Sequence, residues 1–516
     1  MREWLPAGHP VWLVIAAVEQ LDTSAFHRHR RTGGVGRAGY DPDMLLTLLM
    51  WGWAQGVRSS RRIERACEQD VAFRVICAGD APDHTVIARF RAAAASACED
   101  MFAQVLALCA RLGMGQLGVV ALDGVKIASN ASMAANRSEE GLHRAAAAAR
   151  VAAAEHAAAD AAEDDLFGPG DRGDRVPDEV TDPASREGRI AAALADLAAE
   201  REAEQTARTG KAERWLAERD RREGRHAGRP PADIEVEVLT ARLERDTAAR
   251  EAFVADYWSR RAAAEAAGTR DWGREPVQRT AYLTRLQQQV QAAQARQAKR
   301  DARAAGQRRS RNITDPQSRP MPLRGGGWLQ GYNCQAVTSS DGLIIAVSVS
   351  NNPSDVITYT AMAQAAVTAA EMIDAHRPRP GPDRPAGIGT IVADAGYLSA
   401  DNLTAPGPDR IIAVGKAHAV ERAARDNPAI PATDPANPTD PVQAMAHRLR
   451  TPEGIATYRQ RAHIAETPFG HAKHNLGFRR FTSRGLDRAT AEWHFHAAVQ
   501  NLFKAITTGH LAIPAT

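Results

Sequence analysis

Three acidic residues occupy positions at which a carboxylate could take part in binding or catalysis. Asp123 ends the apolar run VVALD, Asp394 ends TIVAD, and Glu466 lies in the segment YRQRAHIAETPFGHAK. Polar residues at strand ends of an α/β sheet project into the crevice where ligands bind. A carboxylate there is costly to desolvate unless a cation or hydrogen bonds compensate for it. The two aspartates therefore suggest a hard-metal site of the Mg²⁺ type with oxygen ligands, and Glu466 is a third candidate that the fold would have to bring to them.

The elements that must position these acids follow an α/β pattern. The apolar run 118–123 predicts a buried strand, and Asp341-Gly342 between two apolar segments predicts a hairpin. A helix, two further apolar strands and a set of C-terminal helices follow. Alternation of strands and helices indicates an α/β core. Its expected elements are strands at 118–123, 331–340, 343–351, 388–397 and 410–416, a helix at 358–376, and helical segments up to residue 508.

Two helical regions accompany this core. Residues 1–117 carry apolar residues at helical spacing, and residues 137–310 are rich in Ala, Arg, Glu and Gln, a composition that favours long helices. Because 137–310 follows the first strand, it interrupts the core as an insertion. The predicted organisation is a helical N-terminal domain (1–117), the first strand of the core (118–136), the helical insertion (137–310), the rest of the core (311–508) and a tail (509–516).

Composition and motifs exclude several classes of protein. The five cysteines form no CxxC pair, so a disulfide scaffold and a structural zinc site are not expected. No leader or membrane-spanning segment is predicted, since the first apolar run is short and flanked by Glu3 and Glu19. GVGRAG (34–39) fits a dinucleotide pattern without the strand and helix that such a site needs. No GxxxxGK[ST] motif is present, so no nucleotide cofactor is expected.

Charge is distributed unevenly although the total is close to balanced. The chain has 516 residues, with 65 Lys and Arg against 62 Asp and Glu, a net charge of +3. Residues 296–324 carry nine Lys and Arg against two acids, and residues 447–488 carry nine against three. Basic runs on both sides of the candidate acids favour DNA as the partner.

Several segments together resemble the DDE insertion-sequence transposases, in the branch with a Y-R-E-K signature. The resemblance rests on the catalytic segments, the N-terminal stretch from YDPDMLLTLL onward and the C-terminal run. The matching segments are DGVKIASNAS (123–132), GYNCQAV (331–337), VADAGY (392–397), PDHTVIARFR (82–91), FGHAKHNLGFRRFTSRG (469–485) and the set Tyr458, Arg461, Glu466 and Lys473.

This resemblance implies a ribonuclease-H-like core, a mixed five-stranded sheet with flanking helices. It implies that Asp123, Asp394 and Glu466 hold two Mg²⁺ or Mn²⁺ ions. Two such ions support in-line displacement at phosphorus, first by water and then by the freed 3′-OH on target DNA. It further implies a homodimer that pairs two element ends. The cysteine pattern described above, in turn, fits a reducing cytosol, so we expect a cytoplasmic protein.

DNA contacts are predicted for two groups of residues. Tyr458, Arg461 and Lys473 would contact the phosphate backbone beside the cut, with Lys126 as a further candidate near Asp123. In the N-terminal domain, two helices joined by a turn would recognise the terminal repeats, and the candidates there are Arg61, Arg62, His84 and Arg89.

The surroundings of Glu466 leave a structural choice open. Pro468 fits a helix only in its first turn or at a kink, so Glu466 either sits at the mouth of a helix or lies inside one that runs on. In the second case Glu466 and Lys473 share a face. Four residues separate Arg461 from Glu466, against three in the usual signature. A metal-dependent nuclease without strand transfer and a non-catalytic DNA-binding derivative remain alternatives.

Overall fold

The computed structural model describes ten stretches of the chain, which form two compact units. One unit comprises Met1–Ala135 and Thr314–Thr516, and the other comprises Asn136–Ile313. GVGRAG lies outside the described residues except for its last residue, and so does the second half of the tail, 513–516. The described residues are 2–28, 30, 39–151, 186–221, 229–269, 274–308, 310–323, 325–378, 386–415 and 440–512.

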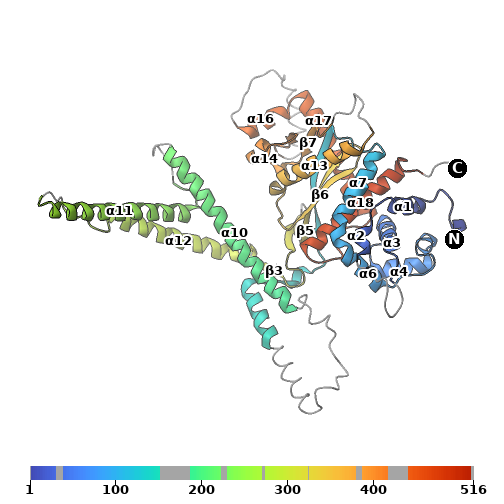
Figure 1. Ribbon diagram of the computed structural model, residues 1–516, viewed down its shortest axis with the longest axis horizontal. Coiled ribbons are helices and arrows are strands. Elements are labelled where there is room, and N and C mark those ends of the chain that lie inside the picture. Colours follow the sequence, from blue (N-terminus) through green and yellow to red (C-terminus); the bar gives the residue numbers. More distant parts are fainter. Residues whose placement is uncertain are drawn as a thin grey trace, which may run out of the picture. The chain divides into compact units, whose positions relative to one another are not determined.

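A mixed sheet forms the centre of the first unit (Figure 1). Its order is β4-β5-β1-β7-β8, and β6 also pairs with β5. β1 is antiparallel to β5 and parallel to β7, which is in turn parallel to β8. The strands are β1 (Val119–Ala128), β4 (Arg319–Pro322), β5 (Trp328–Ser339), β6 (Ile344–Ser350), β7 (Thr390–Ala393) and β8 (Asp409–Ile412). This arrangement agrees with the expected α/β core.

The sheet has six strands, so the prediction of five is wrong by one. β5 is twelve residues long, and its second part, from Asn333 onward, pairs with β6. Its first part pairs instead with β4, from Arg319↔Gly331 to Pro322↔Trp328. The sequence of β4 is RPMP; its two prolines suit an edge strand and hide it from a search for strand patterns.

Helices surround the sheet and join it to the N-terminal region. α7 and α18 lie side by side, α18 and α13 pack on β6, and α17 packs on β1. The helices are α1 (Pro10–Val18), α2 (Ser24–His27), α3 (Pro42–Ala54), α4 (Ser60–Gln69), α5 (Val71–Ile76), α6 (His84–Ala93), α7 (Cys98–Arg111), α13 (Tyr359–His376), α14 (Ala400–Thr404), α16 (Pro441–Arg448), α17 (Pro452–Gly470) and α18 (Leu486–Thr507).

One apolar core runs through the N-terminal helices and the sheet. Trp53 of α3 is 1% exposed and lies edge-on to Phe478 and Phe495, with ring centroids 5.4 and 5.2 Å away. Val105 of α7 and Ile345 of β6 belong to the same buried cluster. In the described residues, the expected boundary at residue 117 therefore does not separate two hydrophobic cores.

By length and composition alone, two described helical stretches could cross a membrane: His84–Arg111 and Val356–His376. They are 56% and 39% buried over the apolar window. Their main helices, α7 and α13, pack against each other, as the core helices of a folded domain do.

The second unit consists mainly of long helices. α10 (Arg186–Arg221), α11 (Glu235–Ala266) and α12 (Ala281–Arg308) pack in sequence order, and residues 139–151 are also helical. Its two ends meet in an antiparallel ladder between β2 (Asn136–Ser138) and β3 (Ser310–Asn312). Arg311 of β3 is 1% exposed and donates to Asp196 and Glu200 of α10, each at 2.5 Å.

Candidate active site

Strand register places Asp123 and Asp394 side by side. The parallel pairing of β1 with β7 runs from Val119↔Thr390 to Leu122↔Ala393. Asp123 and Asp394 are the residues that directly follow this last pair, one on each strand path. β1 continues beside β5 as far as Ala128. Asp123 is therefore inside β1, and the expectation that it ends the strand is wrong. It marks instead the point where the parallel pairing with β7 stops.

Glu466 reaches the site from α17. This helix continues through Pro468 to Gly470 and is followed by a π-helical turn, His471–Asn475. Glu466 is thus inside a helix, and the alternative that places it at a helix mouth is wrong. Proline removes one backbone hydrogen bond from the helix, and a π turn directly after it is a local irregularity of a kind frequent at functional sites.

One cavity brings the three acids together. It has a volume of about 910 Å³. Its walls come from β1, the residue that follows β7, α17 and the turn after α17, together with the end of β4 and the loop after β6. A fourth acid, Asp355, lies in the wall, and three cations accompany the carboxylates. The charged side chains around the cavity are Asp123, Asp355, Asp394, Glu466, Lys126, Arg461 and Lys473.

Arg461 is the cation nearest to the paired aspartates. Its Nη2 lies 3.1 Å from Oδ2 of Asp123 and 3.8 Å from Oδ2 of Asp394. The other carboxylate oxygens accept backbone hydrogen bonds of 2.8 Å, that of Asp123 from Gly124 N–H and that of Asp394 from Gly396 N–H. These contacts fix both carboxylates at the cavity.

The electrostatics at Asp123 favour an added cation. Burial raises the pKa of Asp123 to about 6; Arg461 acts to lower it, and Asp394 raises it. The ionised pair of aspartates is therefore only partly compensated by one guanidinium. A set of carboxylate oxygens facing one cavity suits a hard divalent ion such as Mg²⁺ or Mn²⁺, so the residues present fit the expected metal.

The structure separates the predicted DNA-binding residues into groups. Lys126, Arg461 and Lys473 line the cavity with the acids. Tyr458 does not: it is 8% exposed and packs in an apolar cluster with Ala121 and Met445. A direct phosphate contact by Tyr458 is therefore not available in this arrangement, because this face of α17 is turned toward the sheet.

The N-terminal candidates lie apart from the cavity lining. Arg61 and Arg62 on α4 and Arg89 on α6 are exposed, and their role in DNA binding stays a prediction. His84 begins α6 and contacts two acids, with Nδ1 lying 3.1 Å from Glu64 and 3.4 Å from Asp83.

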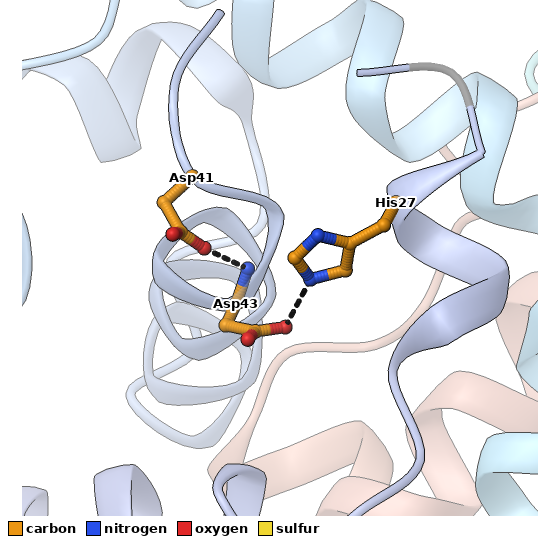
Figure 2. Close-up of side chains that lie close together, drawn as sticks. All are labelled: His27, Asp41 and Asp43. Carbon is orange, nitrogen blue, oxygen red and sulfur yellow. Dashed lines mark hydrogen bonds and ion pairs between the residues drawn. The ribbon is translucent and has the colours of Figure 1, made fainter. Parts of the chain in front are cut away.

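Two further groups of metal-ligating side chains in the described residues have structural explanations. In the first, Asp41 caps α3 by accepting from Asp43 N–H, and His27 Nε2 lies 2.9 Å from Oδ1 of Asp43 (Figure 2). In the second, Asp83 caps α6 and His84 pairs with Glu64. Side-chain caps of this kind satisfy the free N–H groups of a helix start.

Sequence reasoning missed Asp355. It lies between β6 and α13 and lines the cavity, but it ends no apolar strand and stands in a polar turn, NNPSD. A single aspartate in such a turn is ordinary, so only the fold reveals that it faces the same cavity as the other acids.

Two family models match the chain. The Transposase domain (DUF772) matches residues 1–93, and the Transposase DDE domain matches residues 281–502. Together they cover more than half of the chain. Asp394 and Glu466 lie inside the second match, and Asp123 lies between the two. No curated protein and no solved structure matches. With both parts of a transposase matched and the acids gathered in one cavity, the chain belongs to the DDE insertion-sequence transposases.

Proposed function

We propose that this transposase cuts the ends of its element and joins the freed 3′-OH to target DNA by two-metal phosphoryl transfer. The observation that carries the proposal is the meeting of Asp123, Asp394 and Glu466 at one cavity from three separate elements. The family implies dependence on a divalent metal.

The three carboxylates would hold the ions, Mg²⁺ or Mn²⁺, two per site. When bound, such ions activate the attacking oxygen and stabilise the leaving oxygen of an in-line displacement. In the cutting step, a water oxygen bonds to phosphorus as the bond to the 3′ oxygen breaks, which leaves a 3′-OH. In the joining step that hydroxyl bonds to a target phosphorus and a target 3′ oxygen leaves.

The cations at the cavity would receive the DNA backbone. Lys126 and Lys473 line the same walls as the acids, and lysine ammonium groups neutralise phosphates without reading sequence. Burial lowers the pKa of Lys473, which is the cost of keeping this ammonium partly out of water before DNA arrives.

We further propose a homodimer in the DNA complex, and action on the nucleoid of a bacterial-type cytoplasm.

The test is a joining reaction with the element's own terminal repeats, a supercoiled target and Mg²⁺ or Mn²⁺. Wild type should give joined products, and Asp123→Asn, Asp394→Asn and Glu466→Gln should each reduce them at least about 1,000-fold. Asp401→Asn is the matched control, since Asp401 is exposed on α14 outside the cavity. DNA binding of the three variants should persist.

The alternatives give different products. Cleavage without joining by the wild type would identify a nuclease that lacks strand transfer. Binding without cleavage would identify a non-catalytic derivative. Full activity in one acid variant would remove that residue from the site.

A further inference from the structure

Asp355 is the centre of a hydrogen-bond network at the cavity wall. Its Oδ1 accepts from Lys126 Nζ at 3.0 Å, from Asn333 Nδ2 at 2.7 Å and from Gln335 Nε2 at 2.9 Å. Gln335 in turn accepts from the hydroxyl of the buried Tyr397. Three donors on one carboxylate oxygen fix the orientation of Asp355, since charge-assisted hydrogen bonds are the stronger kind.

This network lies directly against the backbone that carries the paired aspartates. A Cβ built on Gly124, the residue after Asp123, would lie 3.1 Å from Oδ1 of Asp355. One built on Gly396, two residues after Asp394, would lie 3.3 Å from its Oδ2. Two glycines thus let Asp355 approach both β1 and the turn that follows β7.

Lys126 and Asp355 form an ion pair at the cavity, in which the carboxylate of Asp355 compensates the positive charge of Lys126. The side chain of Lys126 is 17% exposed and that of Asp355 is 27% exposed. Lysine is a compact charge on a flexible stem. Without Asp355, its ammonium could turn to the other carboxylates that line this cavity and compete there with a divalent ion.

We propose that Asp355 is a positioning residue of the metal site, which holds the ammonium of Lys126 at the cavity wall and away from the metal-binding carboxylates. This inference rests on the proposed function, because it assumes that Asp123 and Asp394 bind the metal. Asp355 acts through Lys126, so its effect must depend on whether Lys126 is present.

The experiment measures Mn²⁺ affinity of the full-length protein without DNA, by calorimetry, in a double-mutant cycle. Asp355→Asn should weaken Mn²⁺ binding at least about tenfold. Lys126→Met in the wild-type background should change it by less than about threefold, because Asp355 already compensates Lys126. Lys126→Met in the Asp355→Asn background should restore the affinity to within about threefold of wild type. Asp401→Asn is the control and should bind as wild type does.

Specific outcomes would overturn this role. One such outcome is that the Asp355→Asn protein folds and binds Mn²⁺ with wild-type affinity. The other is that Lys126→Met changes the Mn²⁺ affinity equally in the wild-type and Asp355→Asn backgrounds. Should Asp355→Asn fail to fold, Asp355→Glu takes its place. This change keeps the charge and should keep the affinity within about threefold, so a tenfold loss contradicts the proposal. A wild type that binds no Mn²⁺, or an Asp394→Asn variant that binds it normally, overturns the metal site itself.

Discussion

At the scale of single residues, the burial of Asp123 links stability to pH. In the metal-free protein its pKa is raised from 3.8 to about 6, chiefly by burial. The folded state therefore holds this proton more tightly than the unfolded state. The resulting stability is present below about pH 4 and is lost as pH rises toward 6.

Asp123→Asn should therefore be more stable than wild type above pH 6 without metal. The gain is at most about 3 kcal/mol, since each pKa unit corresponds to about 1.4 kcal/mol, and it should vanish near pH 4. Urea unfolding in EDTA at several pH values measures it. A variant whose advantage grows toward low pH would contradict this assignment.

Arg461 lies between the two aspartates that we propose as metal ligands, and we propose that it also contacts the DNA backbone. Its guanidinium contacts the carboxylates of both Asp123 and Asp394, so an incoming ion must compete with it. Arg461→Met should tighten Mn²⁺ binding without DNA about three- to tenfold at pH 8, and should weaken DNA binding measured in Ca²⁺. Arg459→Met is the matched control, because Arg459 lies two residues earlier on α17 and is exposed. Unchanged Mn²⁺ affinity in Arg461→Met would show that the guanidinium does not compete.

At the scale of elements, the close contact between β1 and β5 leaves no room beside Gly124. A Cβ there would lie 2.5 Å from Nε2 of Gln335, in the network that holds Asp355. Gly124→Ala should cost about 1–3 kcal/mol of unfolding free energy, the usual range for overpacking, and should reduce cleavage. Gly118→Ala is the control, since nothing lies within 4 Å of a Cβ there. Equal stability of the two variants in urea would contradict the packing argument.

The sequence predicted which segments form strands and helices better than it predicted where those elements end and what they pair with. Apolar runs located β1, β5, β6, β7 and β8, because buried strands need apolar side chains. β4 was missed because its prolines break the pattern. The continuation of α17 through Pro468 was left open, since proline in a helix depends on what packs around it.

The same limit applies to the site. Asp123, Asp394 and Glu466 could be selected from strand context and family motifs, and the fold brings them to one cavity. The burial of Tyr458 and the position of Asp355 could not be selected, because both depend on which face of an element meets the sheet.

At the scale of the whole molecule, the N-terminal helices and the sheet are one packed body. Arg58, in the turn after α3, donates to the carbonyls of Gly477 at 2.7 Å and Arg480 at 3.1 Å, just beyond the turn that carries Lys473. Its guanidinium also lies 4.6 Å from the ring centroid of Phe478. A fragment that starts at residue 118 would lose these contacts together with Trp53, so the described N-terminal helices belong to the packed core of this unit.

The insertion, in contrast, has ends that already meet. Ser138 of β2 pairs with Ser310 of β3, and a two-residue Asn-Gly turn closes such an antiparallel pair. Replacing residues 139–309 by Asn-Gly should therefore leave a folded protein that binds Mn²⁺ within about threefold of wild type, as calorimetry would show. Loss of joining with retained cleavage would assign the insertion to the pairing of DNA ends. Failure of the shortened chain to unfold cooperatively in urea would show that the core depends on the insertion.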